Sequence, residues 1–195
     1  MSSAATPRLA TYSDLLALPE DVRAEVLGGE IVTEPSPLPK HSKAQRSLGG
    51  FIGRPFDDDH GHGGPGGWWI FIEVDVQLGP HDVVRPDLSG WRRERLPNPA
   101  DTRPIDLAPD WVCEVLSPST AARDRKAKSE LYAQSQVPYY WLVDVESRIL
   151  EARTLHDGQW LVAGTYAEDD VARIAPFEEV ELQVGRLFMP KTPEP

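Results

Sequence analysis

PDWVCEVLSPST, residues 109–120, places one glutamate inside a run of apolar residues. Side chains alternate between the two faces of a β-strand, so Val112, Glu114 and Leu116 share one face. Glu114 then sits between two apolar neighbours, and a buried carboxylate costs several kcal/mol unless something compensates its charge. Two interpretations stay open at this point. The glutamate is either a structural residue, paired or exposed at an edge strand, or a functional carboxylate.

Two neighbouring stretches favour a functional carboxylate. Asp87 follows a proline in the strand-like stretch VVRPDLSGW, and STAARDRKAKSELYAQ downstream has the pattern of a helix. On that helix Asp124, Lys128 and Tyr132 are four residues apart and share one face. An aspartate and a glutamate on strands, with a lysine nearby, are typical of metal-assisted phosphodiester cleavage. Hard cations take oxygen ligands, and a lysine can orient the attacking water.

The order of the expected elements gives the fold class. Strand patterns alternate apolar and polar residues, and helix patterns repeat their apolar residues every three to four positions. We expect an α/β or α+β fold with a mixed sheet flanked by helices. The expected helices are 11–27, 41–54 and 119–136, and the expected strands are 30–34, 68–78, 83–91, 111–117, 139–145, 148–155, 159–166 and 178–184.

Length and composition indicate one domain in a reducing compartment. The 195 residues suit a single domain over 11–190, with a mobile tail at 1–10 and a short tail at 191–195. Cys113 is the only cysteine, which excludes an internal disulfide and fits the cytoplasm. No apolar run approaches the roughly 18 residues of a membrane span, so we expect no membrane association.

The net charge of −11 counts against a general nucleic-acid binder, which is usually basic. The charge is unevenly distributed, however. Residues 85–128 hold nine Arg or Lys against seven Asp or Glu. An anionic ligand is therefore expected near this central segment.

Four stretches together resemble a known family. They are GGEIV, VVRPDLSGW, PDWVCEVLSPST and DRKAKSELYAQSQVPYYWLVDV. The chain resembles the Uma-two family of restriction-type endonucleases, within the PD-(D/E)XK nuclease superfamily, over about residues 11–190. The resemblance implies a restriction-endonuclease-like core, a mixed β-sheet flanked by helices.

The resemblance also implies a metal site. Asp87 matches the aspartate of the PD element, Glu114 matches the acid of the (D/E)XK element, and Glu30 matches an additional acid. These three, with the carbonyl of Val115, would hold Mg²⁺ or Mn²⁺.

The lysine is where the sequence departs from the superfamily pattern. Leu116 occupies the position where the superfamily pattern has its lysine. The lysine is therefore expected from the following helix. Lys128 fits that place and Lys126 competes with it. His41 and Tyr132 are expected to contact the substrate.

Other polar stretches have simpler interpretations. The loop DDDHGHGG, residues 57–64, is rich in glycine and has no recognised metal-ligand spacing. Asp144 is expected to cap or pair at a strand end. Ser117 and Ser119 have no companion His and Asp in a triad-like context, which counts against a serine hydrolase.

The leading hypothesis is a Mg²⁺-dependent DNA endonuclease, for which cleavage of both strands would most simply need a homodimer. The first alternative is a nuclease-fold binding or regulatory protein with weak or absent catalysis. The net charge and the absence of a separate DNA-recognition module favour it. The second alternative is a metal-dependent hydrolase of a small phosphorylated compound, which would also suit an acidic protein.

Overall fold

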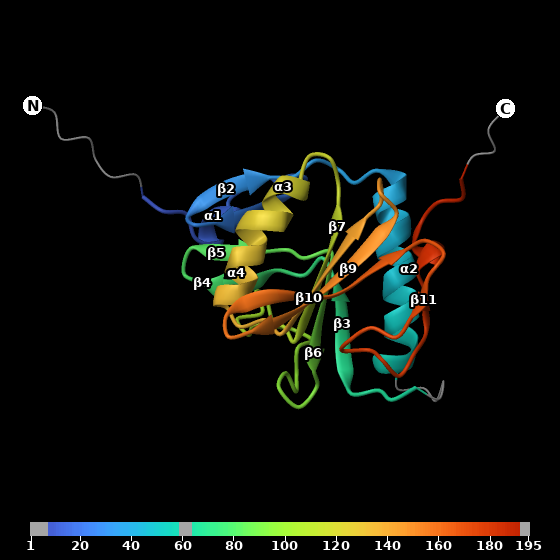
Figure 1. Cartoon of the computed structure of the whole chain (residues 1–195). Helices are drawn as coiled ribbons and strands as arrows, with labels where there is room; N and C mark the ends of the chain where they lie inside the picture. The colour runs from blue at the N-terminus through green and yellow to red at the C-terminus, as the bar shows by residue number, and fades with distance from the viewer. Residues whose placement is uncertain (1–7, 59–63, 192–195) are drawn as a thin grey trace, which may run out of the picture.

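Two β-sheets form the centre of the chain in a computed structural model that describes residues 8–58 and 64–191 (Figure 1). The larger sheet has six strands in the order β10-β9-β8-β7-β6-β3. Its strands are β3 (Trp68–Ile72), β6 (Leu88–Arg92), β7 (Trp111–Leu116), β8 (Tyr139–Asp144), β9 (Ile149–His156) and β10 (Gln159–Ala167). β7 and β8 pair in parallel and the other neighbours are antiparallel, so the sheet is mixed as predicted.

The smaller sheet has four antiparallel strands in the order β2-β1-β5-β4. They are β1 (Ala24–Leu27), β2 (Glu30–Thr33), β4 (Val76–Gly79) and β5 (Asp82–Val84). A third, two-stranded sheet joins β11 (Val171–Ala172) to β12 (Leu182–Gln183). The short helices α1 (Tyr12–Leu16) and η2 (Val184–Leu187) flank the two ends of the described chain.

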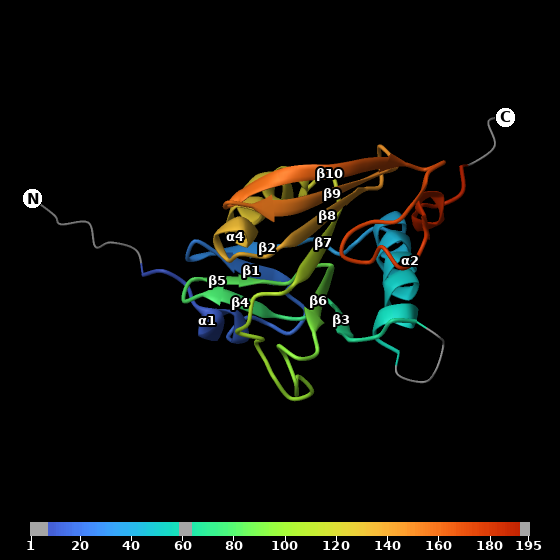
Figure 2. The same cartoon turned by 60° about the horizontal axis from the view of Figure 1, so that its bottom comes forward.

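Helices cover both faces of the larger sheet (Figure 2). The long helix α2 (Pro39–Phe56) packs against one face, where Trp68, Trp111 and Trp141 form the core. The other face carries the helical segment that links β7 to β8, and Tyr132, Val112 and Leu116 lie in its core. This segment comprises α3 (Ala121–Arg123), the π-helical turn η1 (Asp124–Lys128) and α4 (Ser129–Gln134).

Two expected strands are each divided where the chain passes from one sheet to the other. The predicted strand 68–78 stops after Ile72 and resumes as β4, because Glu73 has a left-handed backbone with φ 52°. The predicted strand 83–91 divides into β5 and β6, which leaves Asp87 between the sheets. The two sheets therefore separate at Glu73 and at Asp87. The candidate site described below lies where they separate.

The prediction of a helix over 11–27 is wrong beyond Leu16. Residues 24–27 form β1, which pairs with β2 across a turn where Gly28 and Gly29 have φ of 58° and 81°. Val26 is fully buried between the two neighbouring strands. Pairing and burial therefore override a pattern that also suited a helix. The expected strand 178–184 shrinks to β12, because the next residues form η2.

The ends of the described chain are attached to the domain. The main-chain N–H of Ala10 donates to Gly29 at 2.8 Å, and Lys191 forms an ion pair with Glu168. Most of the expected N-terminal tail, and the histidines of the loop 57–64, lie outside the described residues. Within residues 8–58 and 64–191, none of the helices is long and apolar enough to cross a membrane.

Candidate functional site

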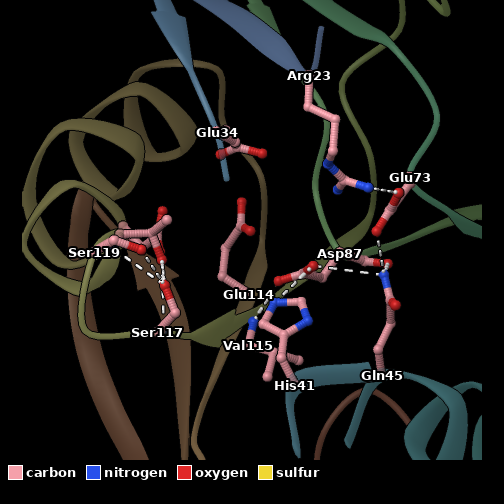
Figure 3. A network of polar contacts seen from close by, with 12 residues as sticks. Arg23, Glu34, His41, Gln45, Glu73, Asp87, Glu114, Val115, Ser117 and Ser119 are labelled. Atoms are coloured by element: carbon pink, nitrogen blue, oxygen red, sulfur yellow. Dashed lines mark hydrogen bonds and ion pairs between the residues drawn. The ribbon is translucent and has the colours of Figure 1, made fainter. Parts of the chain in front are cut away.

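A cavity of about 310 Å³ opens where the two sheets separate. Its walls come from the segment after β2, the first turn of α2, the end of β7 and the turn η1. Figure 3 shows charged side chains from these elements facing one another. The lining includes Arg23, Glu34, His41, Asp87, Glu114 and Lys128.

Asp87 is fixed by contacts at both carboxylate oxygens. Its Oδ2 accepts a 2.7 Å hydrogen bond from the main-chain N–H of Val115, and its Oδ1 lies 3.2 Å from Nε2 of His41. The N–H and C=O of one residue in an extended strand point to the same side. The carbonyl of Val115 therefore points to the side where Asp87 lies. The structure thus brings Asp87 together with Val115, a predicted metal ligand, and with His41, which was predicted to contact the substrate.

Glu114 is 3% exposed on the strand next to Asp87. Its Oε1 accepts hydrogen bonds from the hydroxyl of Tyr132 at 2.6 Å and from Nζ of Lys128 at 3.0 Å. Figure 3 shows its carboxylate pointing toward that of Glu34. Burial raises the pKa of Glu114 well above its usual range, although the Lys128 ammonium opposes the shift. The neighbouring carboxylates of Asp124, Asp87 and Glu25 act in the same direction as burial.

Lys128 is a buried ammonium surrounded by carboxylates. Its Nζ lies 2.8 Å from Glu25 Oε1, 3.0 Å from Glu114 Oε1 and 3.8 Å from Asp124 Oδ1. Burial alone would lower the pKa of Lys128, but these acids outweigh it and hold the pKa well above its usual value. Oε2 of Glu25 is buried without a hydrogen-bond partner in the described part of the chain. Lys128 thus lies among three acids, of which Asp124 also lies 3.9 Å from Nε of Arg123.

The π-helical turn η1 decides which lysine enters the site. Asp124 and Lys128, at its two ends, are buried, whereas Lys126 is exposed. Turns of this kind occur often at functional sites. Tyr132 is fully buried beneath Glu114 and donates to it. Its observed role is therefore to orient Glu114, whereas the sequence analysis assigned it to the substrate.

Glu30 is not brought to the cavity. It is the first residue of β2 and is exposed, whereas the acid that lines the cavity is Glu34, four residues later. Four strand residues span about 13 Å. The segment expected to supply an acid therefore reaches the cavity through Glu34 and not through Glu30. Glu34 forms an ion pair with Arg123. Burial is the main cause that raises the pKa of Glu34, and the nearby Glu25 carboxylate adds to it.

A second polar network lies behind Asp87, and nothing in the sequence indicated that Arg23 and Gln45 would lie there. Arg23 Nη1 lies 2.8 Å from Oε2 of Glu73, and Gln45 Nε2 donates to Oε1 of Glu73 at 3.0 Å. Gln45 also donates to the main-chain oxygen of Asp87 at 3.1 Å. Figure 3 shows Arg23, Glu73 and Gln45 linked one to the next, with Gln45 beside Asp87. The backbone at Glu73 is left-handed, with φ 52°, and the alternating strand pattern of the sequence does not predict it.

Asp144 lies outside the site and has the capping role that was predicted. At the end of β8 its Oδ1 accepts hydrogen bonds from the main-chain N–H groups of Glu146 at 3.0 Å and Ser147 at 2.9 Å. It stabilises the turn that leads into β9.

A family model described as "Putative restriction endonuclease" matches residues 9–185. The chain belongs to this family, Uma2. The match covers nearly the whole chain and confirms the resemblance seen in the four sequence stretches. No curated protein matches the sequence.

A solved structure has the same fold as this Uma2 chain. It is the crystal structure of a "putative nuclease" from Anabaena variabilis, with a TM-score of 0.72 and 22% sequence identity. The alignment covers 91% of this chain and 97% of that one. The likeness confirms the predicted fold class, a mixed sheet flanked by helices, for the Uma2 chain.

Proposed function

We propose that the chain is a metal-dependent endonuclease that hydrolyses phosphodiester bonds of DNA in the cavity between the two sheets. The observation that carries the proposal is the convergence of Asp87, which directly precedes β6, with Glu114 of the adjacent strand β7. Asp87 binds the main chain of the residue after Glu114, and Lys128 binds Glu114 itself. Membership of Uma2 supports nuclease chemistry.

The donor atoms suit a hard divalent cation. Asp87, Glu114 and the carbonyl of Val115 would hold Mg²⁺ or Mn²⁺, since such ions prefer oxygen ligands. Among the described residues, no group of three or more His, Cys, Asp or Glu is arranged to hold a metal. Two carboxylates suffice for Mg²⁺, which keeps several waters and binds substrate phosphate. When bound, the ion would stabilise charge on the phosphate and lower the pKa of a water.

The protein's own side chains have separate roles. Tyr132 and Lys128 hold the carboxylate of Glu114 in one orientation, which makes them positioning residues. The Lys128 ammonium also supplies positive charge beside the position of the attacking water. His41 holds Asp87 from the rim, where it can contact a substrate phosphate.

The test is cleavage of an end-labelled DNA duplex in Mg²⁺, in Mn²⁺ and in EDTA, with Asp87→Asn purified in the same way. We expect cleavage that requires the metal and disappears in the variant. Since each chain holds one such cavity, a single copy would nick one strand and double-strand cleavage would need two copies. Equal cleavage by both proteins would point to a contaminating nuclease and contradict the proposal.

A hydrolase of a small phosphorylated compound is the second candidate. The cavity volume of about 310 Å³ favours it, because this is within the ~300–1,000 Å³ range of small-molecule pockets. Hydrolysis of bis(p-nitrophenyl) phosphate with no cleavage of duplex or single-stranded DNA would support this candidate. Cleavage of DNA that is present at low concentration would favour the endonuclease.

A further inference from the structure

The outer face of α2 carries a basic groove. Lys43, Arg46 and Arg54 lie on the helix face opposite the buried residues, and Arg186 of η2 lies beside them. Together with Ser47, Gly50 and Phe51 they line a shallow groove of about 540 Å³. The groove is separate from the cavity, since the two share no lining residue.

The four cations of this groove are not neutralised by the protein. No carboxylate lines it, and no ion pair joins any of the four to an acid within the described residues. Lys43 donates to Ser47 Oγ at 2.7 Å and to the Arg186 carbonyl at 2.9 Å, both neutral partners. The chain as a whole has a net charge of −11, so this cluster of cations departs locally from its overall acidity. A row of cations without acidic partners is suited to binding a polyanion.

Gly50 keeps the groove open. A Cβ atom added at Gly50 or at Gly53 would meet nothing within 4 Å, so packing inside the protein does not require glycine there. Glycine within a helix lowers its stability relative to alanine. Gly49 differs, because its Cβ would contact Ile72 and Leu88. The bare helix surface at Gly50 therefore leaves room for a ligand to approach the main chain.

The groove leads directly away from the proposed site. α2 begins at the cavity, where His41 lies, and Arg54 is in its last turn (Figure 1). The two residues are 13 positions apart, which corresponds to about 20 Å of helix. At about 3.4 Å per base pair this corresponds to roughly 6 base pairs of duplex.

We propose that the α2 groove binds the sugar–phosphate backbone of a nucleic-acid duplex that flanks the bond in the cavity. The cations bind phosphates without reading sequence, and the bare helix at Gly50 admits the backbone. This inference rests on the proposed function, because it takes the duplex as the substrate. It also resolves the conflict between an acidic protein and an anionic partner, since the contact surface is locally basic.

Salt dependence of binding is the test. We would measure fluorescence anisotropy of a labelled 30-base-pair duplex in EDTA over a range of NaCl, for wild type, Arg46→Gln and Arg54→Gln. The slope of log K against log salt should become shallower by about 0.9 for each lost phosphate contact. Gln159→Glu is the matched control, since it also changes the charge by −1. It is the exposed first residue of β10 and does not line the groove, and the next residue, Trp160, donates to Ser129 of α4.

A neutral variant separates shape from charge. Gly50→Leu fills the groove without changing the charge, and it should weaken binding while the thermal midpoint stays equal or rises. Shortening the duplex to fewer than about 6 base pairs beyond the cleavage point should abolish the effect of Arg54→Gln on binding. The effect of Asp87→Asn on cleavage should remain.

The outcomes distinguish the two proposals. A shallower salt slope in the arginine variants, without DNA cleavage by wild type, would support the groove and contradict the endonuclease. DNA cleavage by wild type with unchanged slopes in all variants would contradict the groove alone. Failure of wild type to bind the duplex at low salt would also overturn the groove as a nucleic-acid surface.

Discussion

Nζ of Lys128 lies 3.0 Å from Oε1 of Glu114, and both side chains are almost fully buried. The contact answers the question raised by a glutamate within an apolar strand. Its charge is compensated by an ammonium from the following helix. The same ammonium lies 2.8 Å from Glu25, so one lysine connects the larger sheet to the hairpin of the smaller one.

Replacing Lys128 with methionine should destabilise the fold. The variant leaves Glu25 and Glu114 buried without their cation, and loss of one partner of a buried pair costs about 3–5 kcal/mol. Urea unfolding would measure the change, with Lys126→Met as the control. Lys126 is exposed, so its replacement should change the free energy of unfolding by less than about 0.5 kcal/mol. Equal effects of the two variants would show that the buried contact contributes nothing.

Metal binding should distinguish Asp87 from Glu30. Titration calorimetry with Mn²⁺ should detect binding by wild type and by Glu30→Gln, because Glu30 is exposed and does not line the cavity. Asp87→Asn should weaken binding by more than the ~10–100-fold that loss of a residue orienting a metal ligand typically costs. A weakened Glu30→Gln would restore the role that the sequence resemblance gave to Glu30.

The turn after β8 should contribute stability that depends on pH. Burial alone would raise the pKa of Asp144, but hydrogen bonds from Ser147 and Glu146 hold it below its ordinary value of 3.8. The contribution is therefore complete above that value and is lost as the pH falls through the lower pKa of the folded state. Asp144→Asn should cost about 1 kcal/mol near pH 7 and progressively less in acid. Urea unfolding at several pH values checks this, with the exposed Asp169→Asn as control.

Two glycine substitutions should act in opposite directions. Gly50→Ala should stabilise the fold by about 0.5–1 kcal/mol, because the added methyl group meets nothing and alanine favours a helix. At Gly90, within β6, a Cβ would lie 3.1 Å from Ile70 and 3.2 Å from Trp111. Gly90→Ala should therefore cost about 1–3 kcal/mol through overpacking. Thermal unfolding of both variants would reveal the signs.

The part of the fold that the sequence predicts best lies around β7. All six of its residues are buried, and this appears in the sequence as a continuous apolar run with one acid. The helix spacing that placed Asp124, Lys128 and Tyr132 on one face is also local information. These three residues are buried together, so strand alternation and helix periodicity sufficed for this half of the site.

The hairpin of β1 and β2 could not be predicted in the same way. Its apolar residues suit both a helix and a strand, and the deciding contacts come from β5, more than 50 residues away. Without the hairpin, Glu25 and Glu34 have no visible relation to Glu114. The breaks at Glu73 and Asp87 likewise depend on tertiary contacts with Arg23, Gln45 and Val115.

Nicking of supercoiled plasmid in Mg²⁺ is the most direct measurement, with wild type, Asp87→Asn, Glu114→Gln and Glu30→Gln purified identically. The account predicts nicking by wild type and Glu30→Gln, and none by the two variants of the proposed metal ligands. Equal nicking by all four proteins, or loss of activity only in Glu30→Gln, would contradict a site built on Asp87 and Glu114.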